Sequence, residues 1–204
     1  MSLGVISEEE CFGFMEDFVQ RSKKSSEPWD LMEHGGKLYI YLKSWKVLSN
    51  QKDHSKVSDN SSDRISEPVE TETDHTICSD EFSNACILFE YYVIYSESYS
   101  VPVLYFNVYN SNGGLVSLSD VWDLVPAHYK ERLEENRWTF ITQSEHPYLG
   151  RPYYQLHPCH TATLMKDVTS MTSSNACSNY LLSWLSAVGP VVLLSLPLTL
   201  ASDT

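Results

Sequence analysis

The sequence predicts an α+β domain, in which a mostly antiparallel sheet is covered by helices. Two observations carry this prediction. Three runs rich in aromatic and β-branched residues, typical of strands, follow one another at 37–49, 85–96 and 101–110. Helical patterns lie before and after them. The length of 204 residues and the 12% aromatic content suit one packed domain spanning residues 1–204.

The first element is predicted to be a helix. Ser7 and Glu10 have the spacing of a capping box, in which each side chain satisfies an amide at the helix start. An apolar stripe then recurs at helical spacing, and we expect it to face the core: Cys11, Phe14, Met15 and Phe18.

The strands follow in sequence order. Residues 25–36, with Trp29, are interpreted as a connection leading to the strand 37–49. The runs 85–96 and 101–110 are separated by a short polar turn, so we expect a hairpin. Pro102 stands near the start of its second strand, where proline is tolerated.

Between the first two strands the composition changes. From Asn50 to about Ser83 the chain fills with Ser, Asp, Glu and Thr, and Phe82 is its only aromatic residue. Such a segment buries too little apolar surface to offset its ordering entropy. We interpret it as an acidic, mobile insertion in the domain.

The second half is predicted to be mainly helical. Ser117-x-x-Asp120 opens a helix that Pro126 divides, and 129–133 continue helical. A last helix is expected over about 175–188, ended by Gly189-Pro190. The β-branched and leucine-rich run 191–200 is expected to be extended.

The stretch 141–165 reads ITQSEHPYLGRPYYQLHPCHTATLM and is rich in helix-breaking residues. Proline fixes its own φ and moves the preceding residue out of the helical region. We therefore expect a short strand, 151–156, which opens into a rigid loop presenting Cys159. A nucleophilic thiol needs exposure and a defined direction of approach, although most cysteines are small buried residues.

Composition excludes several classes. The net charge of −13 argues against a nucleic-acid-binding face. Five scattered cysteines without a C-x-x-C pair indicate neither a disulfide framework nor a cysteine-rich zinc site. With no signal-peptide pattern, we expect a reducing, cytoplasmic setting. The apolar stretch 180–200 is interrupted by Gly189-Pro190 and Pro197, so it is interpreted as buried and not as a membrane span.

Motifs for other chemistry are missing from the sequence. It contains no phosphate-binding G-x-x-x-x-G-K-[ST] or G-x-G-x-x-G, and no H-E-x-x-H or G-x-S-x-G. We expect no cofactor and no metal. A metal site is conceivable only from four irregularly spaced residues: His146, His157, Cys159 and His160. A thiol hydrolase would need a histidine beside the sulfur, and nothing selects His128 or His146 for that role.

Four blocks of the sequence follow one another: VPVLYF, SLSDVW, ITQSEHPYLGRPYYQLHPC and NYLLSWLSAVGPVVLLSLPL. In their order and spacing they resemble the E2-like enzymes of autophagy, the family of autophagy-related protein ten. The resemblance runs from about residue 91 to residue 200. It implies an E2-like fold and a place in a ubiquitin-like conjugation cascade.

The resemblance also implies roles. The family accepts autophagy-related protein twelve from the E1-like autophagy-related protein seven. An enzyme of this family holds autophagy-related protein twelve as a thioester and transfers it to a lysine of autophagy-related protein five. The cysteine of the H-P-C motif is the acceptor, here Cys159, with His157 and Pro158 shaping its loop.

One departure from ubiquitin E2 enzymes leaves a role unassigned. Those enzymes carry an H-P-N tripeptide whose asparagine is a candidate oxyanion donor, and this chain has none. Backbone amides around Cys159 are the simplest source, with Asn107 and Gln155 as side-chain candidates. A non-catalytic E2-related binding module remains the main alternative, and a thiol hydrolase the next.

Overall fold

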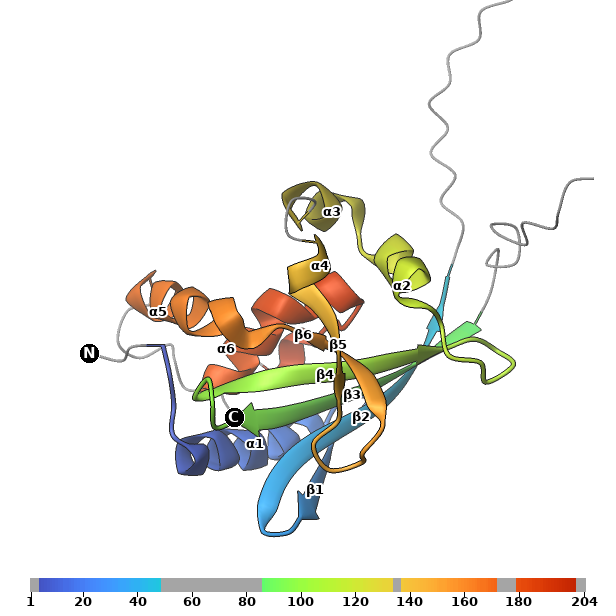
Figure 1. Cartoon of the computed structure of the whole chain (residues 1–204). Helices are drawn as coiled ribbons and strands as arrows, with labels where there is room; N and C mark the ends of the chain where they lie inside the picture. Colours follow the sequence, from blue (N-terminus) through green and yellow to red (C-terminus); the bar gives the residue numbers. More distant parts are fainter. Residues whose placement is uncertain (1–3, 49–85, 134–136, 172–178, 201–204) are drawn as a thin grey trace, which may run out of the picture.

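The structure, a computed structural model, describes residues 4–48, 86–133, 137–171 and 179–200. Its described strands form one antiparallel sheet in the order β1-β2-β3-β4-β6-β5 (Figure 1). The strands are β1 (Asp30–His34), β2 (Lys37–Val47), β3 (Cys86–Ser96), β4 (Val101–Tyr109), β5 (Ile141–Glu145) and β6 (Pro152–Leu156). The helices are α1 (Glu8–Ser22), α2 (Leu118–Leu124), α3 (Ala127–Leu133), α4 (Arg137–Phe140), α5 (Thr161–Met171) and α6 (Tyr180–Val188).

The two faces of the sheet have different coverings. Alternate strand residues point to opposite faces, so Phe89 and Phe106 join the helices while Tyr92 and Tyr105 face the other way. The main core lies on the helix face, where α1 contributes Met15 and Phe18. The β5–β6 hairpin crosses β4 steeply (Figure 1). Its Tyr148, Leu149 and Tyr153 pack on the opposite face, which we call the tyrosine face.

Two predicted caps explain where two helices begin, and the full capping box is formed at the first of them. The Ser7 hydroxyl accepts the Glu10 N–H at 3.1 Å, and the Glu10 carboxylate accepts the Ser7 N–H at 2.7 Å. In α2 the Ser117 hydroxyl accepts the Asp120 N–H at 3.3 Å, so Ser117 is confirmed as the cap. The predicted hairpin is also confirmed, because β3 and β4 pair along nearly their whole length.

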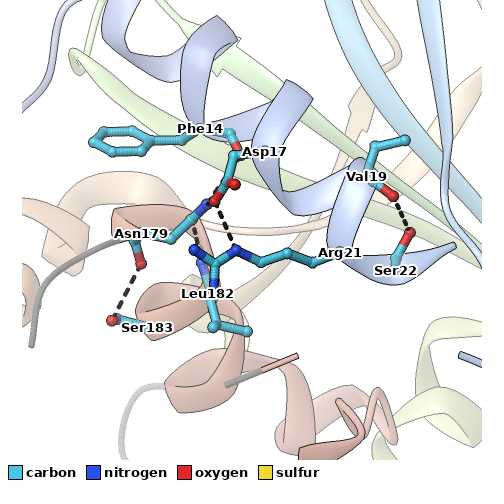
Figure 2. A network of polar contacts seen from close by, with 8 residues as sticks. All are labelled: Phe14, Asp17, Val19, Arg21, Ser22, Asn179, Leu182 and Ser183. Carbon is cyan, nitrogen blue, oxygen red and sulfur yellow. Dashed lines mark hydrogen bonds and ion pairs between the residues drawn. The ribbon is translucent and has the colours of Figure 1, made fainter. Parts of the chain in front are cut away.

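A buried asparagine ties the first helix to the last. Asn179 caps α6 by accepting the Leu182 N–H at 2.9 Å, and its amide donates to the Phe14 carbonyl and to the Asp17 carboxylate (Figure 2). It is 2% exposed. Because Phe14 and Asn179 lie 165 residues apart in the chain, this side chain joins distant parts of the helix layer.

We expect Asn179→Ala to lower the free energy of unfolding by about 2–3 kcal/mol, through loss of a cap and of hydrogen bonds to α1. Urea denaturation measures the change. Ser183→Ala is the matched control, because the Ser183 hydroxyl makes one bond of 3.3 Å to the Asn179 carbonyl, and it should cost about 0.5 kcal/mol. Equal losses in the two variants would contradict this role for Asn179.

His146 holds the turn of the β5–β6 hairpin against the tyrosine face. Its ring is fully buried among tyrosines, with Tyr92 at 4.6 Å and Tyr153 at 5.1 Å between ring centroids. Its Nδ1 accepts the N–H groups of Tyr148 and Leu149, each at 3.2 Å. Burial, aided by the nearby Arg151 cation, lowers the pKa of His146 to about 4.

This histidine predicts a pH dependence of stability. The unfolded chain protonates His146 near pH 6.5 and the folded chain only near pH 4, so the unfolded state binds more protons between these values. The contribution of His146 to stability is present in full above pH 6.5 and is lost as the pH drops, by about 2 kcal/mol at pH 5. Urea denaturation of His146→Asn, which keeps an acceptor but does not titrate, should show a shallower loss. An unchanged slope would refute the assignment.

Three sequence predictions need correction. The connection at 25–36 contains β1, whose five residues are all exposed and lack the alternation of a half-buried strand. The stretch 141–165, predicted to hold a short strand and a loop, also contains β5 and the first part of α5. The run 191–200 is not extended: it begins inside one 3₁₀ turn, Gly189–Val192, and ends with another, Leu198–Leu200, and Leu193 between them has φ 57°.

Two further predictions concern segments outside the residues that the structure describes. The acidic insertion at 50–83 lies outside them, as does 175–178, the first part of the predicted last helix. Within the described ranges, no helix has the length and hydropathy needed to cross a bilayer.

Candidate active site

Cys159 lies on a single 3₁₀ turn, Pro158–His160, which we call the Cys159 turn. The turn follows β6 closely and leads into α5, where the Thr161 N–H donates to the Pro158 carbonyl. Leu156 and Pro158 are buried, whereas Cys159 is exposed. The predicted rigid loop is therefore a helix-initiating turn, anchored by buried residues and directing its thiol to solvent.

The other described cysteines are less suited to react. Cys11 is fully buried in the core, and burial raises the pKa of its thiol to about 12. Cys86 is half-buried at the start of β3. Reactivity needs an accessible thiolate. Among the described cysteines, Cys159 is the one that is exposed.

His157 shapes the turn from inside. Its Nδ1 accepts the Cys159 N–H at 3.2 Å. A neutral imidazole that accepts at Nδ1 carries its proton on Nε2. The Cys159 amide is therefore committed to His157 and is not free to stabilise an oxyanion, while the Nε2–H of His157 is a remaining donor on this ring.

Tyr99 is a neighbour of the site that sequence reasoning missed. It belongs to the β3–β4 turn (97–100), and its ring meets the His157 ring edge to face at 5.7 Å. Lys37 anchors this turn by pairing with Glu97 at 3.0 Å and with Glu8 of α1 at 2.6 Å. No local sequence signal marks Tyr99, because its contact with His157 arises only in the folded chain.

The N-terminal segment (4–7) fits between the β3–β4 turn and α5. The Ile6 N–H donates to the Ser100 carbonyl at 3.0 Å, and the Tyr180 hydroxyl donates to the Gly4 carbonyl at 2.7 Å. Gly4 has φ +75°, and a Cβ there would lie 1.9 Å from the Ala162 carbonyl oxygen. Only glycine permits this approach to the first turn of α5.

The two predicted side-chain oxyanion candidates are engaged within the sheet. Asn107 is buried on β4, and its amide donates to the Pro152 carbonyl at 3.2 Å. Gln155 donates to the Thr142 hydroxyl at 3.2 Å across the β5–β6 pair. These contacts link strands, and neither residue is brought into contact with Cys159 by them.

The histidines that a metal site or a thiol hydrolase would need lie on different elements of the structure. His146 is buried on the tyrosine face, and His128 lies in α3 beside Tyr129. The set His146, His157, Cys159 and His160 is therefore not assembled, and no group of three metal-ligating residues occurs within the described part of the chain. A thiol hydrolase would require an acid-oriented histidine, and the described ion pairs include none with a histidine.

Comparison with known proteins identifies the family. The family described as "Autophagocytosis associated protein, active-site domain" matches residues 9–199. The chain belongs to this family.

The relatives are more specific. The human ubiquitin-like-conjugating enzyme ATG10 is 34% identical over 198 residues, which span 92% of this chain and 89% of the relative. The ATG10 enzyme of Arabidopsis thaliana is 44% identical over 133 residues, spanning 63% of this chain and 59% of the relative. A crystal structure of the autophagic E2 Atg10 aligns over 94% of this chain and 99% of its own, with TM-score 0.45 and 14% identity.

Within its family the chain is thus an ATG10-type, E2-like conjugating enzyme. This membership, together with the antiparallel sheet and its helices, confirms the predicted E2-like α+β class. The predicted enzyme class is confirmed as well, whereas the role of each site residue stays a prediction.

The bond between His157 and the Cys159 amide can be tested without substrate. We expect His157→Ala to speed hydrogen exchange of the Cys159 amide about fivefold, since a hydrogen bond worth about 1 kcal/mol is lost. NMR exchange rates measure this. His160→Ala is the matched control, because His160 is exposed on the same turn, and its variant should exchange like the wild type. Unchanged exchange in His157→Ala would show that the ring does not hold the turn.

Proposed function

We propose that Cys159 receives a ubiquitin-like protein as a thioester and passes it to a lysine. The observation that carries this proposal is the exposed thiol on a turn fixed by buried neighbours, in a chain of the ATG10 family. Such a turn fixes the direction from which an acyl group approaches the sulfur.

The chemistry has two transfers. In the first, the Cys159 sulfur attacks the thioester carbonyl on the E1-like enzyme, whose thiolate departs. In the second, a lysine amine attacks the new carbonyl, the Cys159 sulfur departs and an isopeptide bond forms. The attacking lysine starts with a pKa of about 10.4 and must lose a proton.

Each transfer passes through a tetrahedral oxyanion that needs a donor. The Cys159 amide already donates to His157, and the side chains of Asn107 and Gln155 are engaged within the sheet. We therefore propose the Nε2–H of His157 for this role.

The partners follow from the resemblance of the sequence to its family. We propose autophagy-related protein twelve as the ubiquitin-like protein, autophagy-related protein seven as the E1-like donor and autophagy-related protein five as the lysine acceptor. The relatives' names, ubiquitin-like-conjugating enzymes, support the class of reaction. A reduced thiol at the site fits the cytoplasm, which we propose as the setting.

The test mixes the chain with the E1-like enzyme, the ubiquitin-like protein and ATP, followed by a non-reducing gel. We expect a thiol-sensitive adduct with the wild-type chain, and with Cys159→Ser either a thiol-resistant ester or no adduct, because oxygen replaces the sulfur. Cys86→Ser is the matched control and should retain the thiol-sensitive adduct, since Cys86 is half-buried at the start of β3.

Two outcomes would contradict the proposal. A thiol-sensitive adduct that persists in Cys159→Ser would move the acceptor to another cysteine. A wild-type chain that stays unmodified while the E1-like enzyme is charged would favour a non-catalytic binding module.

A further inference from the structure

Single exposed apolar side chains are common on protein surfaces, whereas those on adjoining segments beside a binding site can mark a surface that a ligand covers. Within the described residues eight large ones are exposed: Val5, Leu31, Met32, Trp45, Val47, Tyr99, Leu115 and Leu198. Of these, Val5 and Tyr99 belong to segments that pack against the Cys159 turn or α5. They are 37% and 43% exposed.

Val5 is held outward by its neighbours. Gly4 and Ile6 on either side are buried, the first against the opening turn of α5 and the second as part of the main core. The Tyr95 hydroxyl also donates to the Ile6 carbonyl at 3.0 Å. With both flanking residues fixed, Val5 has a defined place on the surface next to the helix that begins at the Cys159 turn.

Tyr99 is fixed to the same surface. Its ring contacts His157, and the next residue, Ser100, accepts the Ile6 N–H at 3.0 Å. Ser100 itself has φ 53°, a left-handed conformation that closes the β3–β4 turn, and its N–H donates to the Ser96 carbonyl at 2.8 Å. The segments of Val5 and Tyr99 are therefore hydrogen-bonded to each other, and both contact the unit that carries Cys159.

We propose that Val5 and Tyr99 form an apolar rim that holds the extended C-terminal tail of the ubiquitin-like protein beside Cys159. This inference rests on the proposed function. A thioester joins the last carbonyl of the tail to the Cys159 sulfur, so the residues before it must lie across the neighbouring surface in every charged molecule. Apolar contacts there position the carbonyl for attack at little entropic cost, because both segments are already fixed.

The test is the rate of single-turnover charging from the E1-like enzyme. Val5→Asp places a carboxylate where the tail would lie and should slow charging about tenfold or more. Val47→Asp is the matched control, because Val47 is 72% exposed at the end of β2 and pairs with Cys86, at the far end of β3 from the β3–β4 turn. It should charge within about twofold of the wild type.

A milder variant guards against misfolding. Val5→Thr keeps the branched shape and replaces one methyl by a hydroxyl, and it should charge at an intermediate rate while its urea midpoint stays that of the wild type. Binding of the uncharged chain to the E1-like enzyme is measured in parallel, and we expect neither Val5 variant to change it.

Several results would overturn the inference. Val5 variants that charge like Val47→Asp would show that the rim does not touch the tail. A loss of affinity for the E1-like enzyme would make the rim a docking surface for that enzyme, and a loss confined to lysine transfer would assign it to the acceptor. If the wild type itself is not charged, the proposed function fails and the rim hypothesis with it.

Discussion

The attachment of β6 to β4 is the constraint on which the site depends. Backbone pairing between these two strands covers only Tyr105–Gln155 and Phe106–Tyr154, so side chains must secure β6. Tyr154 donates to the Val116 carbonyl at 2.9 Å on the helix face, and Tyr153 donates to Glu90 at 3.2 Å on the other. A strand fixed from both faces cannot slip by one residue without exchanging its buried tyrosines. The position of the Cys159 turn after β6 follows from this register.

The tyrosine face complements that attachment. His146, buried among the rings, caps the hairpin turn that precedes β6. Burial also raises the pKa of Tyr153, as do its Tyr92 and Glu90 neighbours, so its hydroxyl remains a neutral donor to the Glu90 carboxylate. His146, whose pKa is strongly lowered, thus supports the fold of the hairpin, and its ring contacts are with residues of the tyrosine face and not with the Cys159 turn. A search for perturbed pKa values alone would have selected the tyrosine face, and not the Cys159 turn on which the proposed function rests.

Sequence patterns predicted the elements whose signals are local. The Ser7 cap, the β3–β4 hairpin and the H-P-C turn each depend on residues close together in the chain. The sequence did not reveal β1, since an exposed edge strand has no alternation, and it misjudged 191–200, since β-branched residues also pack in 3₁₀ turns. Tyr99 and Gly4 were missed because their importance comes from tertiary contacts. Cys159 itself was found through its motif, while its exposure required the fold.

If Cys159 works as proposed, the chain needs no hydrolase-like triad around it. A triad activates a weak nucleophile and then activates water. A thiol that exchanges with another thioester starts from an activated acyl group. The exposure of the sulfur and a fixed direction of approach then matter more than activation of the nucleophile. The role proposed for His157 agrees with this, because its Nδ1 accepts the Cys159 N–H and so holds the turn. The same hydrogen bond leaves the Nε2–H of His157 as a second donor group on this ring, and it is this group that we propose for the oxyanion.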